Sequence, residues 1–226
     1  NIMRTLSVIA AGVMSVWLVG CGQPAQTDAQ SDSAAAMPDA KTIADAASGV
    51  DMNVDYNVPV EYFKLDNGLK VVLSKDETAP TVTVAVYYNI GFRNEPKDRT
   101  GFAHLFEHLM FKGSHNLQSD EHLTLISRVG GDANAYTTED ETVFFETVPA
   151  QYLPLILWLE ADRMATLTID EQSLDSEREV VKEERRWRYE NEPFGLLSEL
   201  LYDHAFSVHP YKHTPIGSMA DLEAAS

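Results

Sequence analysis

Two histidines and a glutamate in the middle of the chain have the types and the spacing that suit a metal ion. His104 and His108 are four positions apart, and Glu107 directly precedes the second histidine. On a helix, residues three and four positions apart lie on one face, so the two imidazoles and the carboxylate would project together. Two neutral imidazoles on successive turns can bind one Zn²⁺ at about 2.0–2.1 Å each. Glu107 would then serve as general base for a metal-activated water.

A third protein ligand is needed, because a catalytic zinc usually has three of them and one open position. The acidic segment 177–185 offers Glu177 and Glu184, which are seven positions apart and would share one face of a helix. Val180 and Val181 between them would press that face toward the core. We predict Glu184 as the third ligand and Glu177 as a supporting catalytic residue that orients a histidine or tunes the water.

The elements that must position these residues follow from the hydrophobic pattern. Asn67-Gly68 between two apolar runs predicts a hairpin, because both turn positions favour positive φ. Alternating valines in 81–88 predict a strand. Further strands are expected at 133–137 and 142–148, and helices at 101–111, 120–129, 152–164, 170–189 and 196–206. The sequence therefore predicts an α+β fold, with an antiparallel or mixed β-sheet and helices packed on one face.

The composition limits the classes of function. The formal net charge is −18, which argues against nucleic acid as a partner, because a polyanion needs a basic face. A single cysteine, Cys21, excludes an internal disulfide. Of the remaining histidines, His115 and His122 are expected on the polar surface, and His209 and His213, in a Pro-containing loop without helical spacing, in a structural or surface role rather than as a metal pair.

The first part of the chain has the pattern of an export signal. A basic start and an apolar run of about 14 residues precede Leu18-Val19-Gly20-Cys21, which resembles the lipobox of bacterial lipoproteins. That resemblance implies cleavage before Cys21 and lipidation of its thiol; the alternative is a plain secretory signal with an incidental cysteine. We predict a signal peptide in 1–20, an Ala/Ser/Asp/Gln-rich disordered tether in 21–57 and a folded domain in 58–226. The expected location is the bacterial cell envelope, with a membrane partner through the lipid anchor, on the periplasmic face of the outer membrane.

The order His-x-x-Glu-His inverts the commoner zinc-peptidase motif. With Glu184 lying 76 positions after His108, the chain resembles the M16 family of peptidases, which includes pitrilysin, insulin-degrading enzyme and the mitochondrial processing peptidase. Other segments agree with this resemblance: 91–95, 110–114, 131–137 and 177–184. It covers 58 to the end of the chain. It implies one zinc ion per chain, held by His104, His108 and Glu184, with Glu107 as the base.

The same resemblance implies how substrate binds. Asn134, Ala135, Tyr136 and Thr137 would form an edge strand that receives a peptide or an unfolded polypeptide segment as an added strand. Complete enzymes of the family pair the zinc-bearing domain with a second, similarly folded half. The chain stops within what resembles the first half, so a second M16-like half or a partner subunit is expected.

Two other classes of function remain open at this stage. A non-catalytic subunit could bind peptides for an active partner, although such homologues typically lose the metal residues. A lipoprotein could instead store or sense zinc, in which case Glu107 would have no catalytic role. The metal content of the purified chain separates the first alternative from a zinc-dependent endopeptidase.

Overall fold

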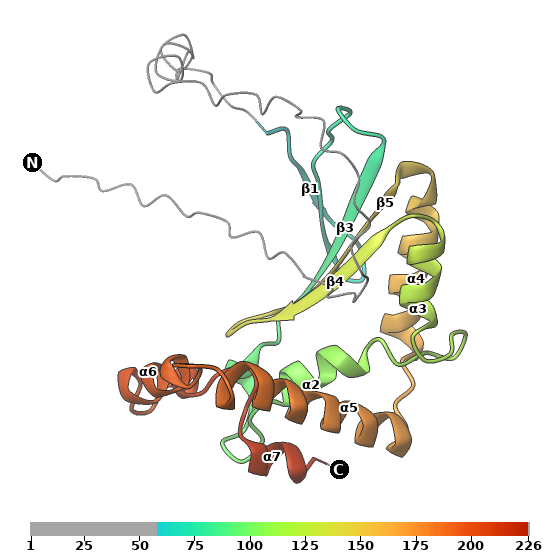
Figure 1. Cartoon of the computed structure of the whole chain (residues 1–226). Helices are drawn as coiled ribbons and strands as arrows, with labels where there is room; N and C mark the ends of the chain where they lie inside the picture. Colours follow the sequence, from blue (N-terminus) through green and yellow to red (C-terminus); the bar gives the residue numbers. More distant parts are fainter. Residues whose placement is uncertain (1–57, 226) are drawn as a thin grey trace, which may run out of the picture. The chain divides into compact units, whose positions relative to one another are not determined.

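The computed structural model describes residues 58–225. Its strands are β1 (Glu61–Lys64), β2 (Lys70–Leu73), β3 (Thr81–Tyr88), β4 (Asp132–Thr137) and β5 (Thr142–Pro149). Its α-helices are α2 (Phe102–Leu109), α3 (Glu121–Arg128), α4 (Leu153–Thr166), α5 (Glu171–Arg185), α6 (Leu197–Ala205) and α7 (Met219–Glu223). The α+β class predicted from the sequence is confirmed (Figure 1). The predicted signal peptide, Cys21 and the tether lie outside the described residues.

Strands β1 and β2 form the hairpin that Asn67-Gly68 predicts. They pair in antiparallel register, with Tyr62 opposite Val72. Gly68 has a φ of 94°, a conformation that favours glycine. The side chain of Asn67 accepts a hydrogen bond from the Leu69 amide at 3.1 Å, which closes the turn.

The larger sheet has the order β3-β5-β4, and both pairs are antiparallel. Val82 lies opposite Val148 and Val84 opposite Glu146, so the alternating valines of β3 share a face with the buried side chains of β5. That face is covered by helices, because α4 contacts β3 and β5 while α3 contacts β4 (Figure 1). The core between them contains Leu117, Ile126, Val148, Ile156 and Leu159.

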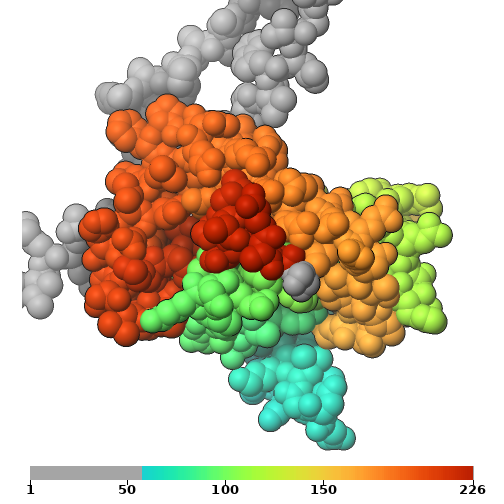
Figure 2. All heavy atoms as spheres, turned by 90° about the horizontal axis from the view of Figure 1, so that it is seen from below, coloured from blue at the N-terminus to red at the C-terminus, as the bar shows by residue number. Residues whose placement is uncertain are grey.

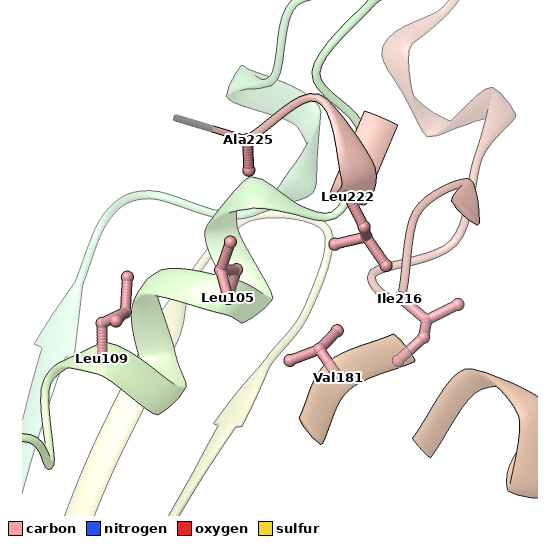
Figure 3. Packing of buried hydrophobic residues seen from close by; sticks show 6 residues of the cluster. All are labelled: Leu105, Leu109, Val181, Ile216, Leu222 and Ala225. Carbon is pink, nitrogen blue, oxygen red and sulfur yellow. The ribbon is translucent and has the colours of Figure 1, made fainter. Parts of the chain in front are cut away.

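A second core joins α2 to α5. It contains Leu105, Leu109, Val181, Ile216, Leu222 and Ala225 (Figure 3). Figure 2 shows the last segment of the chain, in dark red, packed between the green segment that contains α2 and the orange segment that contains α5. Burial of these apolar side chains holds the two helices together, and each fully buried leucine contributes about 1.5–3 kcal/mol. The metal-site residues predicted from the sequence lie on these two helices.

Three details of the sequence interpretation were wrong. Leu105 and Phe106 both belong to the apolar pattern that predicts the helix 101–111 and were both expected in the core, but 48% of the surface of Phe106 is exposed. Val180 was expected to press inward with Val181, but it is exposed as well. In both cases the neighbouring residue faces the core, and one step along a helix rotates a side chain by about 100°. The predicted helix 170–189 is α5 followed by one turn of π-helix, Arg186–Glu190.

Within the described part of the chain, every helix is too short or too polar to cross a membrane.

Candidate metal centre

Helix α2 begins where a loop and a carboxylate fix its first turn. Gly101 has a φ of 90°, and a Cβ there would lie 2.7 Å from the carbonyl oxygen of Ile216, so only glycine allows this close approach. The carboxylate of Glu95 accepts hydrogen bonds from the amides of Gly101 (2.8 Å) and Ala103 (2.7 Å). It also lies 2.8 Å from Nε2 of His213. This network satisfies amides that the helix itself leaves free, and it places the next residue, His104.

Helix α5 presents its acidic face to α2. It begins at a capping box formed by Asp170 and Ser173, and Val181 on its inner face packs against α2. Near its end, Arg185 donates a hydrogen bond to the carbonyl oxygen of Gly217 at 2.6 Å, which ties the helix to the loop that meets Gly101. The two helices are therefore held by one core and one shared loop.

Three predicted ligands converge between these helices. Oε2 of Glu184 lies 3.7 Å from Nε2 of His104 and 3.4 Å from Nε2 of His108. Ligands bound to a tetrahedral zinc at 2.0–2.1 Å lie about 3.3 Å from one another. The two distances from Glu184 are therefore close to the separation that one zinc ion requires, and the ligand atoms of the three residues all lie within 4.8 Å of one another. Their chemistry, two imidazole nitrogens and one carboxylate oxygen, is also that of a catalytic zinc site.

Burial and charge put two of these groups in the state that a metal ion needs. Burial, together with the neighbouring His108, lowers the pKa of His104, so this imidazole is neutral at pH 7. Burial raises the pKa of Glu184, but the hydrogen bond from His108 and the nearby positive charges outweigh it and keep the carboxyl ionised. Nδ1 of His104 is buried and has no hydrogen-bond partner in the described structure.

His108 is the residue of the three that holds a proton most firmly. Burial lowers the pKa of its imidazole, but the hydrogen bond to Glu184 and the charges of Glu184, Glu107 and Glu177 outweigh burial and raise it. A divalent cation that binds between the same groups would compete with this proton, because a metal-binding histidine must be neutral.

Glu107 lies beside the three ligands and is held by a residue of the sheet. The hydroxyl of Thr137, at the end of β4, donates a hydrogen bond to Oε2 of Glu107 at 2.5 Å. Burial raises the pKa of Glu107, and the Thr137 hydrogen bond opposes that rise. A buried carboxylate of raised pKa is a stronger base than one in water. No local pattern of residues indicates this contact, because it joins residues 30 positions apart.

Glu177 lies behind His108. Its Oε2 is 3.4 Å from Nδ1 of His108, and its Oε1 is 3.0 Å from the ammonium of Lys112. Oε1 of Glu184 is similarly held at 2.8 Å by Arg188, which lies four positions further along the chain in the π-helical turn after α5. In each glutamate the second oxygen faces an imidazole. Lys112 was not singled out from the sequence, although it lies one helical turn beyond His108.

All of these groups line one cavity of about 500 Å³. The predicted substrate residues Asn134, Ala135, Tyr136 and Thr137 line it too, and Tyr136 is partly exposed. Ala135 lies opposite Phe144 in the register, and along the strand side chains point alternately toward and away from the helices. Among the described strands β4 has one neighbour, β5, so its outer edge is not paired with a strand, and the Ala135 amide donates a hydrogen bond to Oδ1 of Asn134 at 2.8 Å.

A second cluster of possible metal ligands lies in the other core. His122, Glu146 and Glu160 each place one ligand atom within 4.8 Å of the others. The guanidinium of Arg163 bonds to Oε1 of both glutamates, the same oxygens that face His122. A cation already neutralises this cluster, so we assign it to the ion network of the core.

The position of His122 corrects a prediction, since it was expected on the polar surface and is buried. It lies four positions before Ile126, which places both side chains on the core face of α3. Phe111 packs against its ring, at 6.3 Å between centroids.

The α+β fold and the cluster of two imidazoles and one carboxylate have the make-up expected of a half-domain of the inverted-motif metallopeptidases. Residues 70–218 match the sequence profile described as insulinase, peptidase family M16. The chain belongs to this family.

The chain is similar to proteins from bacteria and mitochondria. Zinc protease PqqE of Helicobacter pylori is 38% identical over 177 residues, which are 77% of this chain and 40% of that protein. The beta subunit of the mitochondrial-processing peptidase of Blastocladiella emersonii is 28% identical over 191 residues, 82% of this chain and 40% of the relative. The chain thus spans about two fifths of the length of these relatives.

Solved structures of bacterial proteases have a similar fold. A crystal structure of a protease from Helicobacter pylori has a TM-score of 0.73 and 39% identity, and the match covers 76% of this chain and 41% of that one. The periplasmic protease PqqL from Escherichia coli has a TM-score of 0.67 at 24% identity, over 74% of this chain and 19% of that one. The second likeness is evidence for the fold alone.

Proposed function

We propose that the chain is the zinc-bearing part of an endopeptidase that hydrolyses peptides or unfolded polypeptide segments. The observation that carries this proposal is the convergence of two imidazoles and one carboxylate, with Glu107 beside them in the same cavity. The names of relatives such as zinc protease PqqE support the same chemistry. We propose one Zn²⁺ per chain, held by His104, His108 and Glu184.

Some residues of the site would bind zinc, and others would transfer the proton. Bound zinc would supply a Lewis acid that polarises the scissile carbonyl and makes a water molecule more acidic. Glu107 is placed to accept a proton from the attacking water and to deliver it to the leaving amine. Thr137 fixes one oxygen of Glu107 and leaves the other for this proton. Glu177 orients His108 through Nδ1.

Substrate would bind along β4. An extended peptide can pair with the outer edge of Asn134–Thr137 through main-chain hydrogen bonds. Because such bonds do not involve side chains, peptides of many different sequences could bind there. Because Thr137 ends β4 and contacts Glu107, a strand paired there passes the general base. Pairing of this kind suits unfolded segments, since folded proteins rarely offer an unpaired strand.

Replacing Glu107 by glutamine tests the proposal. Glutamine keeps the size and the Thr137 contact but cannot accept the proton. We expect Glu107→Gln to bind zinc as the wild type does and to lose at least about 10²-fold in kcat on an unfolded peptide. Zinc content by atomic absorption and cleavage by mass spectrometry provide the two readouts, in the assembly in which the wild type is active.

Glu179→Gln is the matched control, because Glu179 lies exposed on α5 with Lys182 as its partner. It should leave zinc content and kcat unchanged. Hydrolysis by Glu107→Gln at the wild-type rate would rule out the assigned base. A purified wild-type chain that binds peptide but no zinc would favour the alternative, a non-catalytic peptide-binding or scaffold subunit.

We further propose that the chain works with a second M16-like half or a partner subunit. The chain spans about two fifths of its relatives, and exposed apolar side chains on α6, such as Leu197 and Leu201, offer surface for a partner. The chain alone should therefore hydrolyse peptide more slowly than the assembly purified from its source. Equal rates would contradict this requirement.

We also propose a location in the bacterial envelope with a lipid on Cys21, at the periplasmic face of the outer membrane. The lipobox-like Leu18-Val19-Gly20-Cys21, after a basic start and an apolar run, supports both the anchor and the envelope location. Cells fed a labelled fatty acid should label the wild type and not Cys21→Ser. Label retained in that variant would exclude this anchor.

A further inference from the structure

Lys112 lies at the junction between α2 and α5 and contacts two carboxylates. Its ammonium is 3.0 Å from Oε1 of Glu177 and 3.0 Å from Oδ1 of Asp120. The lysine side chain is only 19% exposed, and that of Glu177 is 6% exposed. The pair is therefore shielded from solvent on the side of Glu177, where an ion pair is stronger than at the surface.

The contact determines which oxygen of Glu177 meets His108. With Oε1 bound to Lys112, Oε2 is the oxygen left to face Nδ1 of His108, at 3.4 Å. An imidazole that donates its Nδ1 proton to a carboxylate keeps the lone pair on Nε2. Nε2 of His108 is the atom that faces Glu184. The orientation of one histidine ligand thus depends on a carboxylate whose own orientation depends on Lys112.

We propose that Lys112 is a positioning residue of the metal centre, which acts through Glu177 to hold His108 in the tautomer and ring orientation that bind zinc. This inference rests on the proposed function, because it concerns the same zinc site. Lys112 lies outside the His-x-x-Glu-His motif, in the segment that follows α2. The series of contacts runs from Asp120 through Lys112 and Glu177 to His108.

Electrostatics and positioning predict opposite results for the loss of Lys112. A lysine near a Zn²⁺ site repels the ion, so removal of the positive charge alone would strengthen zinc binding. Loss of orientation would weaken it, since removing a group that orients a metal ligand typically costs 10–100-fold in affinity. The sign of the change therefore separates the two roles.

The test measures zinc affinity of the full chain by competition with a chromophoric chelator. We expect Lys112→Met to weaken zinc binding by about tenfold or more, and Lys112→Arg to retain most of the affinity because it keeps the cation. Lys182→Met is the matched control: Lys182 on α5 is buried and also contacts two glutamates, Glu179 and Glu223, but each of those is 60% exposed. It should change zinc affinity less than about twofold.

A double-mutant cycle shows whether Lys112 acts through Glu177. If it does, Lys112→Met should cost nothing further in a Glu177→Gln background, whereas independent roles would give additive losses. Urea unfolding of each variant checks that the fold is retained. Should Lys112→Met not fold, Lys112→Gln, which keeps a polar side chain, serves in the same cycle.

The outcomes distinguish the two proposals. Unchanged or stronger zinc binding in the Lys112 variants, or fully additive losses in the cycle, would overturn the positioning role and leave the zinc site standing. A wild-type chain that binds no zinc would overturn the proposed function and this inference with it.

Discussion

Two buried clusters of similar composition differ at the scale of single residues. Each contains histidine and glutamate side chains close enough to share an ion. In the core cluster, the guanidinium of Arg163 bonds to the glutamate oxygens that face His122. In the cluster between α2 and α5, Arg188 holds the far oxygen of Glu184, and the near oxygen is left to the imidazoles. The position of the cation therefore decides which cluster can take a metal.

The core cluster gives a prediction about stability and pH. Burial, with a hydrogen bond to Glu146, raises the pKa of Glu160 from its ordinary value of 4.5 to about 8. Between these two values the folded chain keeps a proton that the unfolded chain has lost, so this group makes the free energy of unfolding fall as pH rises from 5 to 8. The slope is at most about 1.4 kcal/mol per pH unit.

Glu160→Gln should remove this part of the decline, because glutamine resembles the protonated acid and does not titrate. Urea unfolding of the wild type and the variant at pH 5, 6, 7 and 8 measures the two slopes. Glu179→Gln, at an exposed position, should keep the wild-type slope. An identical decline in Glu160→Gln and the wild type would show that Glu160 is ionised in the folded chain.

At the scale of elements, the metal centre depends on the contact between α2 and α5. Leu105 is buried in that contact, next to the first ligand, whereas its neighbour Phe106 is half exposed. Leu105→Ala should lower the free energy of unfolding by about 2–5 kcal/mol, because it removes buried methyl groups and leaves a cavity. Phe106→Ala should cost less than about 1 kcal/mol.

Urea unfolding measures both values, provided that the variants share the wild-type dependence on denaturant. The pair is informative because the sequence alone ranks the phenylalanine and the leucine as equal members of one apolar stripe. Equal losses in the free energy of unfolding would contradict the burial of Leu105 and the exposure of Phe106, and would mean that α2 is rotated about its axis.

The parts of the site that sequence could predict are those fixed within one helix. His104, Glu107 and His108 share a face through helical periodicity, and the seven-residue spacing relates Glu177 to Glu184. The contacts of Thr137 with Glu107 and of Lys112 with Glu177 depend on how β4, α2 and α5 pack. No local pattern determines those partners, so only the structure reveals them.

In the fold too, local features could be predicted from the sequence and long-range pairings could not. Strands and helices with strong periodicity were predicted within a few residues, and β3 has the bounds expected from its alternating valines. The hairpin around Asn67-Gly68 was predicted from local backbone preference, but its loop spans 65–69 and only Gly68 of the two turn residues has a positive φ. The order β3-β5-β4 did not, because it depends on long-range pairing across the α2–α3 segment.

At the scale of the whole molecule, the described residues bring together the proposed zinc ligands, the proposed general base and the outer edge of β4. All three border the same cavity. The chain spans about two fifths of the length of these family relatives, so we expect the surfaces that enclose substrate in an active assembly to need further protein. Because the chain has a formal net charge of −18, its partner in any such assembly would bind an acidic chain.

The central claim is that one zinc ion lies between α2 and α5. Diffraction from crystals of the zinc-loaded chain, recorded on both sides of the zinc absorption edge, locates the ion directly. The account predicts one anomalous peak per chain, about 2.0–2.2 Å from Nε2 of His104, Nε2 of His108 and a carboxylate oxygen of Glu184. A peak among His122, Glu146 and Glu160 instead, or no peak at the α2–α5 site in zinc-saturated crystals, would contradict it.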